Sequence, residues 1–78
     1  MIYPNPFNNE INVNLNTEWI GKAIEYALYD LTGRIMLSQE LIADHELIKI
    51  ETNELTKGHY FLKIIGNNEV ITEKIIKQ

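Results

Sequence analysis

Polar and apolar residues alternate strictly along one stretch of this chain, Glu10-Ile11-Asn12-Val13-Asn14-Leu15-Asn16. Successive side chains of a strand point to opposite faces of a sheet, whereas a helix repeats about every 3.6 residues. The alternation therefore predicts a half-buried strand whose Ile11, Val13 and Leu15 face a core. The fold has to provide a sheet with one apolar face for this strand.

Two prolines lie just before this strand, in Tyr3-Pro4-Asn5-Pro6. Each proline fixes its own φ and pushes the preceding residue towards extended or polyproline II geometry. The missing N–H groups suit such a segment to an edge or a tether, and Asn8 and Asn9 supply turn chemistry. We expect residues 1–9 to form a proline-containing leading segment and residues 10–78 to form the folded domain.

Residues 17–31 fit both a helix and a strand. A helix would align the apolar positions Ile20, Ala23, Ile24, Ala27 and Leu28, whereas a strand would align Ile24, Tyr26 and Leu28 on one face. Gly21 costs a helix about 1 kcal/mol relative to Ala, and tyrosines favour a strand. Periodicity alone leaves the two patterns nearly even.

The sequence Asp30-Leu31-Thr32-Gly33 favours the strand. Asp at the first position and Gly at the fourth are typical of a type I turn, and a left-handed Gly after such a turn closes a three-residue hairpin with a bulge. We therefore expect a returning strand over Arg34–Leu41, with Ile35 and Leu37 facing inward.

The remaining segments also have strand character. Leu47–Glu51 alternates, although a helix over residues 41–55 would also align apolar positions. His59–Ile65 and Glu69–Lys77 are rich in aromatic or branched residues, and Gly66-Asn67-Asn68 between them is a strong turn signal. Six or seven short strands, spaced about ten residues apart, predict a sandwich or small barrel.

Size and composition limit the chemistry that the chain can perform. Its 78 residues make one domain, whose core supplies only about 3–5 kcal/mol of net stability. The absence of cysteine excludes disulfides and thiolate metal sites. A net charge of −4 with interspersed signs disfavours nucleic-acid binding. No apolar run approaches the roughly 18 residues of a membrane-spanning helix.

Candidate catalytic groups are few and scattered. Neighbouring residues of an extended chain point apart, so Asp44-His45-Glu46 is expected to be a solvated loop rather than a metal site. Ser38 has no histidine placed to activate it, His59 is expected at a strand rim, and the four glycines lie too far apart for a phosphate loop. We expect no enzyme, catalytic residue, metal, cofactor or small-molecule substrate.

The aromatic residues allow one further function class. Trp19, Tyr26, Tyr29 and Tyr60 would suit a sugar-binding face. Small all-β domains, however, need large side chains to fill their interior. We therefore expect Tyr26 and Tyr60 in the core and Trp19 over one end of the sandwich.

Four sequence features, taken in order, closely resemble the type A C-terminal sorting domain of type IX secretion cargo in Bacteroidota. They span nearly the whole chain and are Tyr3-Pro4-Asn5-Pro6, Leu28-Tyr29-Asp30-Leu31-Thr32-Gly33-Arg34, Leu55-x-x-Gly58-x-Tyr60-Phe61 and Lys74-Ile75-Ile76-Lys77. Each feature alone is weak, and the ordered set is highly specific. His59 departs from the family, which more often has an apolar residue before the tyrosine.

The resemblance implies both a fold and a role. The fold is an all-β, immunoglobulin-like sandwich of about seven short antiparallel strands in two sheets, which decides both helix ambiguities in favour of strands. Cargo of this family reaches the periplasm through an N-terminal signal peptide on upstream sequence. The sorting domain is then recognised by the outer-membrane translocon. A sortase-like cysteine peptidase usually removes it, which leaves the cargo at the cell surface or secreted.

The resemblance also distributes roles over the residues. Tyr3, Pro4, Asn5 and Pro6 become the cargo junction, held extended and accessible. Asp30, Gly33 and Arg34, with Gly58 and Tyr60, form structural turn motifs, in which Asp30 fixes its turn through its own side chain. Lys74, Ile75, Ile76 and Lys77 become the candidate element read by the translocon. Such a strand can be read by backbone pairing along its edge, or the isoleucines complete the core and the lysines keep the edge soluble.

Other readings of a small β domain remain open beside the sorting signal. One is an accessory binding module, for carbohydrate, on a secreted protein, and the other is an immunoglobulin-like spacer. A sorting domain ends its precursor, and a finish on Lys77-Gln78 without a linker favours that role. Exposed edge strands would also allow a strand-exchanged homodimer.

Overall fold

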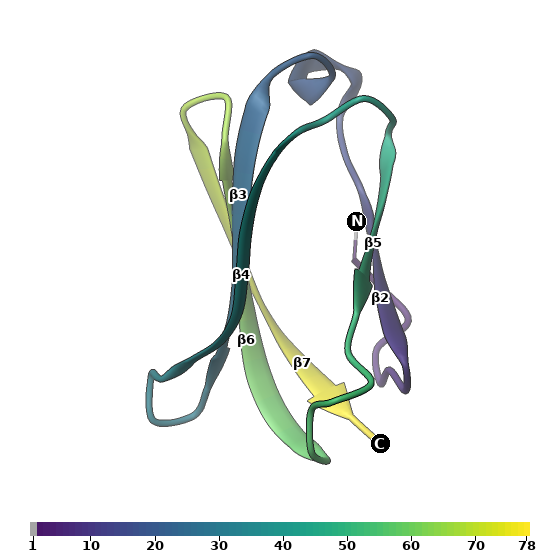
Figure 1. Ribbon diagram of the computed structural model, residues 1–78, viewed down its shortest axis with the longest axis vertical. Coiled ribbons are helices and arrows are strands. Elements are labelled where there is room, and N and C mark those ends of the chain that lie inside the picture. Colours follow the sequence, from purple (N-terminus) through teal and green to yellow (C-terminus); the bar gives the residue numbers. More distant parts are fainter. Residues whose placement is uncertain (1) are drawn as a thin grey trace.

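The computed structural model describes residues 2–78, which form seven strands and one turn of 3₁₀ helix (Figure 1). The elements are β1 (Ile2–Tyr3), β2 (Glu10–Asn14), η1 (Thr17–Trp19), β3 (Ala23–Asp30), β4 (Ile35–Ile42), β5 (Leu47–Glu51), β6 (Gly58–Gly66) and β7 (Glu69–Lys77). The all-β class expected from the sequence is confirmed, and strands occupy both regions where a helix was the alternative.

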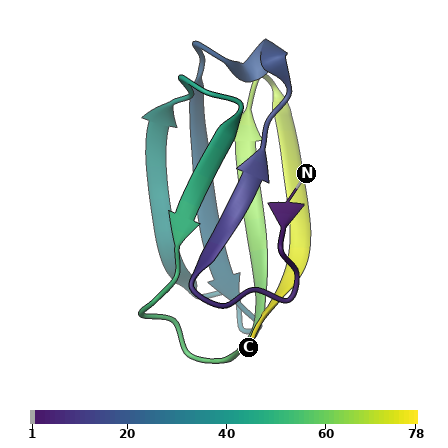
Figure 2. The ribbon, with the colours of Figure 1, turned by 90° about the vertical axis from the view of Figure 1, so that its right-hand side faces the viewer.

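The strands pair antiparallel into two sheets that face each other. One sheet has the order β1-β2-β5 and the other the order β4-β3-β6-β7. Figure 1 shows the sheets edge-on, with η1 at the upper end, and Figure 2 shows the smaller sheet in front of the larger one. In a constant-type immunoglobulin domain the fourth strand pairs with the fifth. Here β4 lies beside β3, so the sandwich is immunoglobulin-like with the fourth strand in the larger sheet.

Side chains from both sheets and from η1 form a single core. Trp19 of η1 is only 1% exposed, and Leu28, Leu62 and Ile75 of the larger sheet are fully buried. β2 and the residue that follows it contribute the three inward residues of the alternating segment, all buried as predicted: Ile11, Val13 and Leu15. Leu55, in the loop between β5 and β6, is also buried.

A β-bulge changes the phase of β4. Leu28 of β3 lies opposite Leu37, but the next residue, Tyr29, lies opposite Ile35, so Met36 is an extra residue in β4. Leu37 packs against the core as predicted. The prediction that Ile35 faces inward is wrong, because the bulge turns it to the outer face, where it is 56% exposed.

The two-residue turn between β6 and β7 fits the strong turn signal at residues 66–68. Asn67 and Asn68 have φ angles of 48° and 60°. Positive φ at both central residues defines a type I′ turn, whose twist matches that of the flanking strands. Asparagine tolerates this backbone region better than other non-glycine residues. The turn allows β6 and β7 to pair over their whole length.

The proline-containing segment belongs to the sandwich. It begins with β1, bends at residues 5 and 6, and continues to Phe7, which is fully buried. The Tyr3-Pro4 and Asn5-Pro6 bonds are both cis, and both prolines are exposed. The segment was expected to run extended. It turns towards β7 instead, because Phe7 reaches the core there and its backbone bonds to the last strand.

Candidate functional site

The candidate recognition element, residues 74–77, divides by face. Lys74 and Ile76 lie on the outer face of the larger sheet, opposite Phe61 and His59. Ile75 and Lys77 face inward and are 0% and 8% exposed. This division follows from the alternation of side chains along β7. Only Lys74 and Ile76 offer side chains to a partner without a change in structure.

The N-terminal segment binds the end of β7 through its backbone and one side chain. The Asn5 side chain accepts from the N–H of Ile76 at 3.0 Å and donates to the carbonyl of Lys74 at 3.2 Å. The N–H of Phe7 donates to the Ile76 carbonyl, and the Phe7 carbonyl accepts from the N–H of Gln78, both at 2.9 Å. We call these bonds, from Asn5 and Phe7 to residues 74–78, the terminal contact.

The terminal contact occupies one end of the free edge of β7. In an antiparallel strand, alternate residues present their backbone groups to the same edge. Lys74 and Ile76 present theirs to Asn5 and Phe7, so strand addition at residues 74–78 would first have to displace the N-terminal segment. By the same alternation, Val70 and Thr72 also present their backbone groups to this edge. Residues 2–78 supply no backbone partner for them there.

Lys77 connects β7 to the loop that follows β5. Its Nζ donates to the backbone carbonyl of Thr52, which also accepts from the N–H of Leu55 at 3.1 Å. The Thr52 hydroxyl donates to the carbonyl of Asn8 at 3.3 Å. A buried charge needs such a partner, since an unpaired one is strongly destabilising. The position of Lys77 therefore makes it an internal link rather than a surface charge.

The turn between β3 and β4 is organised by Asp30. One carboxylate oxygen accepts from the Thr32 hydroxyl at 2.6 Å, the Thr32 N–H at 2.9 Å and the Arg34 N–H at 3.0 Å. The Thr32 hydroxyl, followed by the Arg34 N–H, holds the pKa of the Asp30 carboxyl below its usual value. The other oxygen pairs with Nε of Arg34 at 3.2 Å. Gly33 closes the turn with a φ of 89°.

A second motif orders the loop before β6. The Tyr60 hydroxyl donates to the carbonyl of Thr56 at 2.6 Å, four residues upstream. A tyrosine that bonds back in this way near the start of the sixth strand is a tyrosine corner, a feature of immunoglobulin-like sandwiches. Gly58, between the two residues, has a φ of 151°, which L side chains rarely adopt.

Most of the aromatic side chains considered for a sugar-binding face are buried in the core. Trp19, Tyr26 and Tyr60 are 1%, 9% and 3% exposed, which places all three where core packing was expected. The Tyr26 hydroxyl donates to Oε1 of Gln39 at 2.9 Å, and burial raises its pKa. Of the four candidate residues, only Tyr29 is more than slightly exposed, and one partly exposed ring does not make a sugar-binding face.

Acidic residues and histidines do not converge. Within residues 2–78, no group of three His, Asp or Glu side chains is arranged to hold a metal ion. His45 Nε2 and Asp44 Oδ2 are 4.0 Å apart, and both side chains are at least 80% exposed. The part of the chain that the structure describes has no helix long and apolar enough to span a membrane.

Neither the alternation of polar and apolar residues nor the turn signals pointed to the role of Asn5 and Phe7. They lie about 70 positions before residues 74–78 in the sequence, so only the fold brings them together. The one available signal was a single apolar residue, Phe7, set between Pro6 and Asn8. The structure thus joins the two segments that were singled out separately, the proline-containing segment and the last strand.

A comparison with known families gives a match that covers the whole chain. The family model of the secretion system C-terminal sorting domain matches residues 1–78. No curated protein matches the sequence. The matched span includes the terminal contact, both turn motifs and β7. The chain therefore belongs to the family of type IX secretion system C-terminal sorting domains.

Proposed function

We propose that this domain carries an upstream cargo protein across the outer membrane, and that the translocon reads the outer face of β7 at Lys74 and Ile76. Membership of the sorting-domain family supports the general role. The observation that supports this site is the division of residues 74–77 between two faces. An exposed Lys and Ile, next to Phe61 and His59, offer both charge and apolar surface.

The remaining steps of the proposal follow the family. Cargo enters the periplasm, the folded domain is recognised by the translocon, and a sortase-like peptidase removes it at the surface. Residues 3–6, at the N-terminal edge of the sandwich, serve as the cargo junction, and the exposed prolines there support access from solution. The domain needs no cofactor and performs no catalysis in this scheme.

Reading by side chains is favoured over reading by backbone pairing at residues 74–78. Backbone pairing there requires four hydrogen bonds of the terminal contact to break first. The outer face needs no such change. The edge at residues 70–72 remains open to strand addition, including exchange between two copies, which light scattering of the purified domain measures.

The test is export of a fluorescent protein that carries an N-terminal signal peptide and residues 2–78 at its C-terminus, in a host with the type IX machinery. Lys74→Ala and Ile76→Ala should leave the fusion in the periplasm. Both side chains are exposed or partly exposed, so the free energy of unfolding should change by no more than about 0.5 kcal/mol.

Matched controls lie on the same sandwich. Lys49→Ala removes an exposed charge from the smaller sheet, and Val70→Ala removes a branched side chain that is 58% exposed at the other end of β7. Both controls should be exported normally. Normal export of the Lys74 and Ile76 variants would contradict the proposed site, and periplasmic retention of the unaltered fusion would contradict the sorting role itself.

A further inference from the structure

The edge of β7 next to the turn at residues 67 and 68 offers backbone groups to a further strand. The terminal contact covers this edge only at residues 74–78. By the alternation of an antiparallel strand, Val70 and Thr72 direct their N–H and C=O groups to the same edge. β7 is the last strand of its sheet, and residues 2–78 place no strand beside it on this side. Two donors and two acceptors are therefore available for strand addition.

The outer side of this edge carries positive charge. Lys74 follows Thr72 by two positions on the outer face of β7, and Lys63 of β6 lies directly opposite Thr72. Neither ammonium group forms an ion pair with a carboxylate in the part of the chain that the structure describes. The acidic residues on the outer face of this sheet, Glu25 and Glu40, lie opposite each other on β3 and β4. The end of the face at β6 and β7 is thus a positive region in a chain whose net charge is −4.

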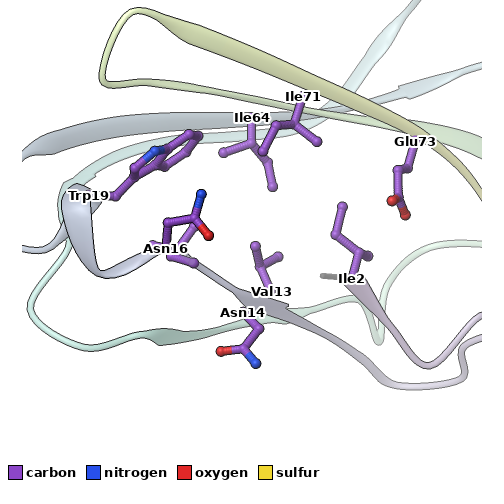
Figure 3. A pocket seen from close by; sticks show the side chains of 9 residues that line it. Ile2, Val13, Asn14, Asn16, Trp19, Ile64, Ile71 and Glu73 are labelled. Carbon is purple, nitrogen blue, oxygen red and sulfur yellow. The ribbon is translucent and has the colours of Figure 1, made fainter.

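The inner side of the same edge is acidic and apolar. Glu69, Ile71 and Glu73 point to this side, and all three are exposed. Figure 3 shows Ile71 and Glu73 at a pocket of about 110 Å³, whose lining combines apolar residues with Asn14 and Asn16. A carboxylate placed on the inner side would be repelled by the two glutamates, whereas an apolar side chain can pack on Ile71. The two sides of the edge therefore favour different side chains.

We propose that the open edge of β7 binds an extended acidic segment of a partner protein, which adds as a strand at residues 69–73 and directs its carboxylates towards Lys63 and Lys74. Successive side chains of a strand alternate between faces, so the acidic residues of the partner recur at every second position, with apolar residues between them. This inference rests on the proposed function and gives the chemistry of the partner that reads Lys74. A peptide is favoured over an anionic lipid surface, because only a peptide backbone matches the donors and acceptors of the edge.

The register brings one carboxylate of the added strand close to both lysines. A residue opposite Thr72 is a diagonal neighbour of Lys74, and diagonal neighbours are about 7–8 Å apart, within reach of long side chains. Lys63 lies on the other side of Thr72, whose short side chain leaves room for the lysine to extend over it. Complementary charge of this kind fixes the register and orientation of a bound segment.

The test titrates the purified chain with two synthetic peptides of identical composition, each acetylated and amidated at its ends. Thr-Glu-Val-Glu-Val-Glu-Thr places all its carboxylates on one face of a strand, and Thr-Glu-Glu-Val-Val-Glu-Thr divides them between both faces. With the first peptide, the amide resonances of Val70 and Thr72 should shift and their hydrogen exchange should slow. The second peptide should bind at least about fivefold more weakly, because one carboxylate meets the inner glutamates.

Charge reversal tests the two lysines. Lys74→Glu should weaken binding of the first peptide about fivefold, and the combination with Lys63→Glu at least about tenfold, since each change replaces attraction by repulsion. Lys49→Glu makes the same charge change on the smaller sheet and should alter the dissociation constant less than about twofold at 0.15 M salt. Lys74 is exposed, so the single variant keeps the test decisive if the double variant does not fold.

Three outcomes would overturn the inference: no binding of the first peptide, equal binding of the two peptides, or equal affinity of the Lys49 and Lys74 variants. Vesicles of phosphatidylglycerol provide the alternative probe. Shifts at Lys63 and Lys74 with these vesicles, without shifts from the peptide, would assign the positive region to an anionic membrane and overturn the proposal of a protein partner.

These outcomes are separable from the proposed function. The titration uses the purified chain without secretion machinery, so failure of the peptide to bind leaves the sorting role and the export results intact. Normal export of the Lys74→Ala fusion would contradict the proposed site even where the purified chain binds the peptide.

Discussion

Asp30 shows how one side chain can fix a turn. Its carboxylate accepts two backbone N–H groups and one hydroxyl, all within four residues. The Arg34 side chain adds little to stability, since it is 74% exposed and exposed ion pairs are weak. The hydrogen bonds that Asp30 accepts, rather than its ion pair with Arg34, stabilise the hairpin turn.

The hydrogen bonds to Asp30 predict a pH dependence. The pKa of Asp30 in the folded state lies below the usual value of 3.8. Its contribution to stability is therefore present above the pKa of the unfolded chain and is lost as the pH falls through the folded pKa. Asp30→Asn should lower the free energy of unfolding at pH 7 and remove this part of the acid dependence.

Denaturant unfolding at pH 7 and at pH 3, together with an NMR titration of the Asp30 carboxyl, measures this effect. Asp44→Asn is the matched control, because Asp44 lies in an exposed loop and its side chain is 84% exposed. The control should unfold like the unaltered chain at both values of pH. An Asp30 variant with the same acid dependence as the unaltered chain would show that the turn does not depend on the carboxylate.

At the scale of elements, the terminal contact connects the first and last parts of the chain. Asn5 presents an acceptor and a donor to the backbone of β7, as a neighbouring strand would. Exposed edge strands promote aggregation unless they are blocked. A single asparagine and the backbone of Phe7 thus protect the edge that residues 74–78 would otherwise expose.

Removal of the Asn5 side chain should loosen this edge selectively. Asn5→Ala removes two hydrogen bonds, each worth about 0.5–1.5 kcal/mol net when buried and less at an exposed site. We expect a loss of stability of about 1 kcal/mol and hydrogen exchange of the Ile76 amide that is about fivefold faster. Native-state exchange followed by NMR measures both quantities.

Asn8→Ala is the control for this prediction, because only the backbone carbonyl of Asn8 takes part in a bond, with the Thr52 hydroxyl. Exchange at Ile76 should stay unchanged in that variant. Equal exchange at Ile76 in the Asn5 and Asn8 variants would mean that the Phe7 backbone alone holds the edge.

Most strands could be predicted from local patterns, and the contacts between distant segments could not. Glu69–Lys77 coincides with β7 because its branched residues and the turn before it both favour a strand there. Leu47–Glu51 coincides with β5, although a helix over residues 41–55 also fitted the apolar spacing. The prediction that Ile35 faces inward was wrong because a single extra residue, Met36, reverses the alternation of β4, and no sequence signal marks that residue. The terminal contact depends on which edge β1 joins, and composition and periodicity do not specify that pairing.

For the whole molecule, the small size makes each fully buried side chain important. A core of this size leaves about 3–5 kcal/mol of net stability. Ile75 is fully buried in a strand that also carries the candidate recognition side chains. Deletion of residues 74–78 would therefore unfold the domain and remove the signal together, so a loss of export after that deletion cannot separate folding from recognition.

Neighbouring isoleucines of β7 allow that separation. Ile75→Ala should cost about 2–5 kcal/mol, because it leaves a cavity in the core, and this loss is comparable to the whole stability of the domain. Ile76→Ala, which shortens a side chain that is 37% exposed, should change the free energy of unfolding by about 0.5 kcal/mol or less. Urea unfolding followed by circular dichroism measures both. If both variants lose export and only Ile75→Ala loses structure, the machinery requires the folded sandwich and also contacts its outer face. A folded, fully stable Ile75→Ala domain would contradict the placement of this residue in the core.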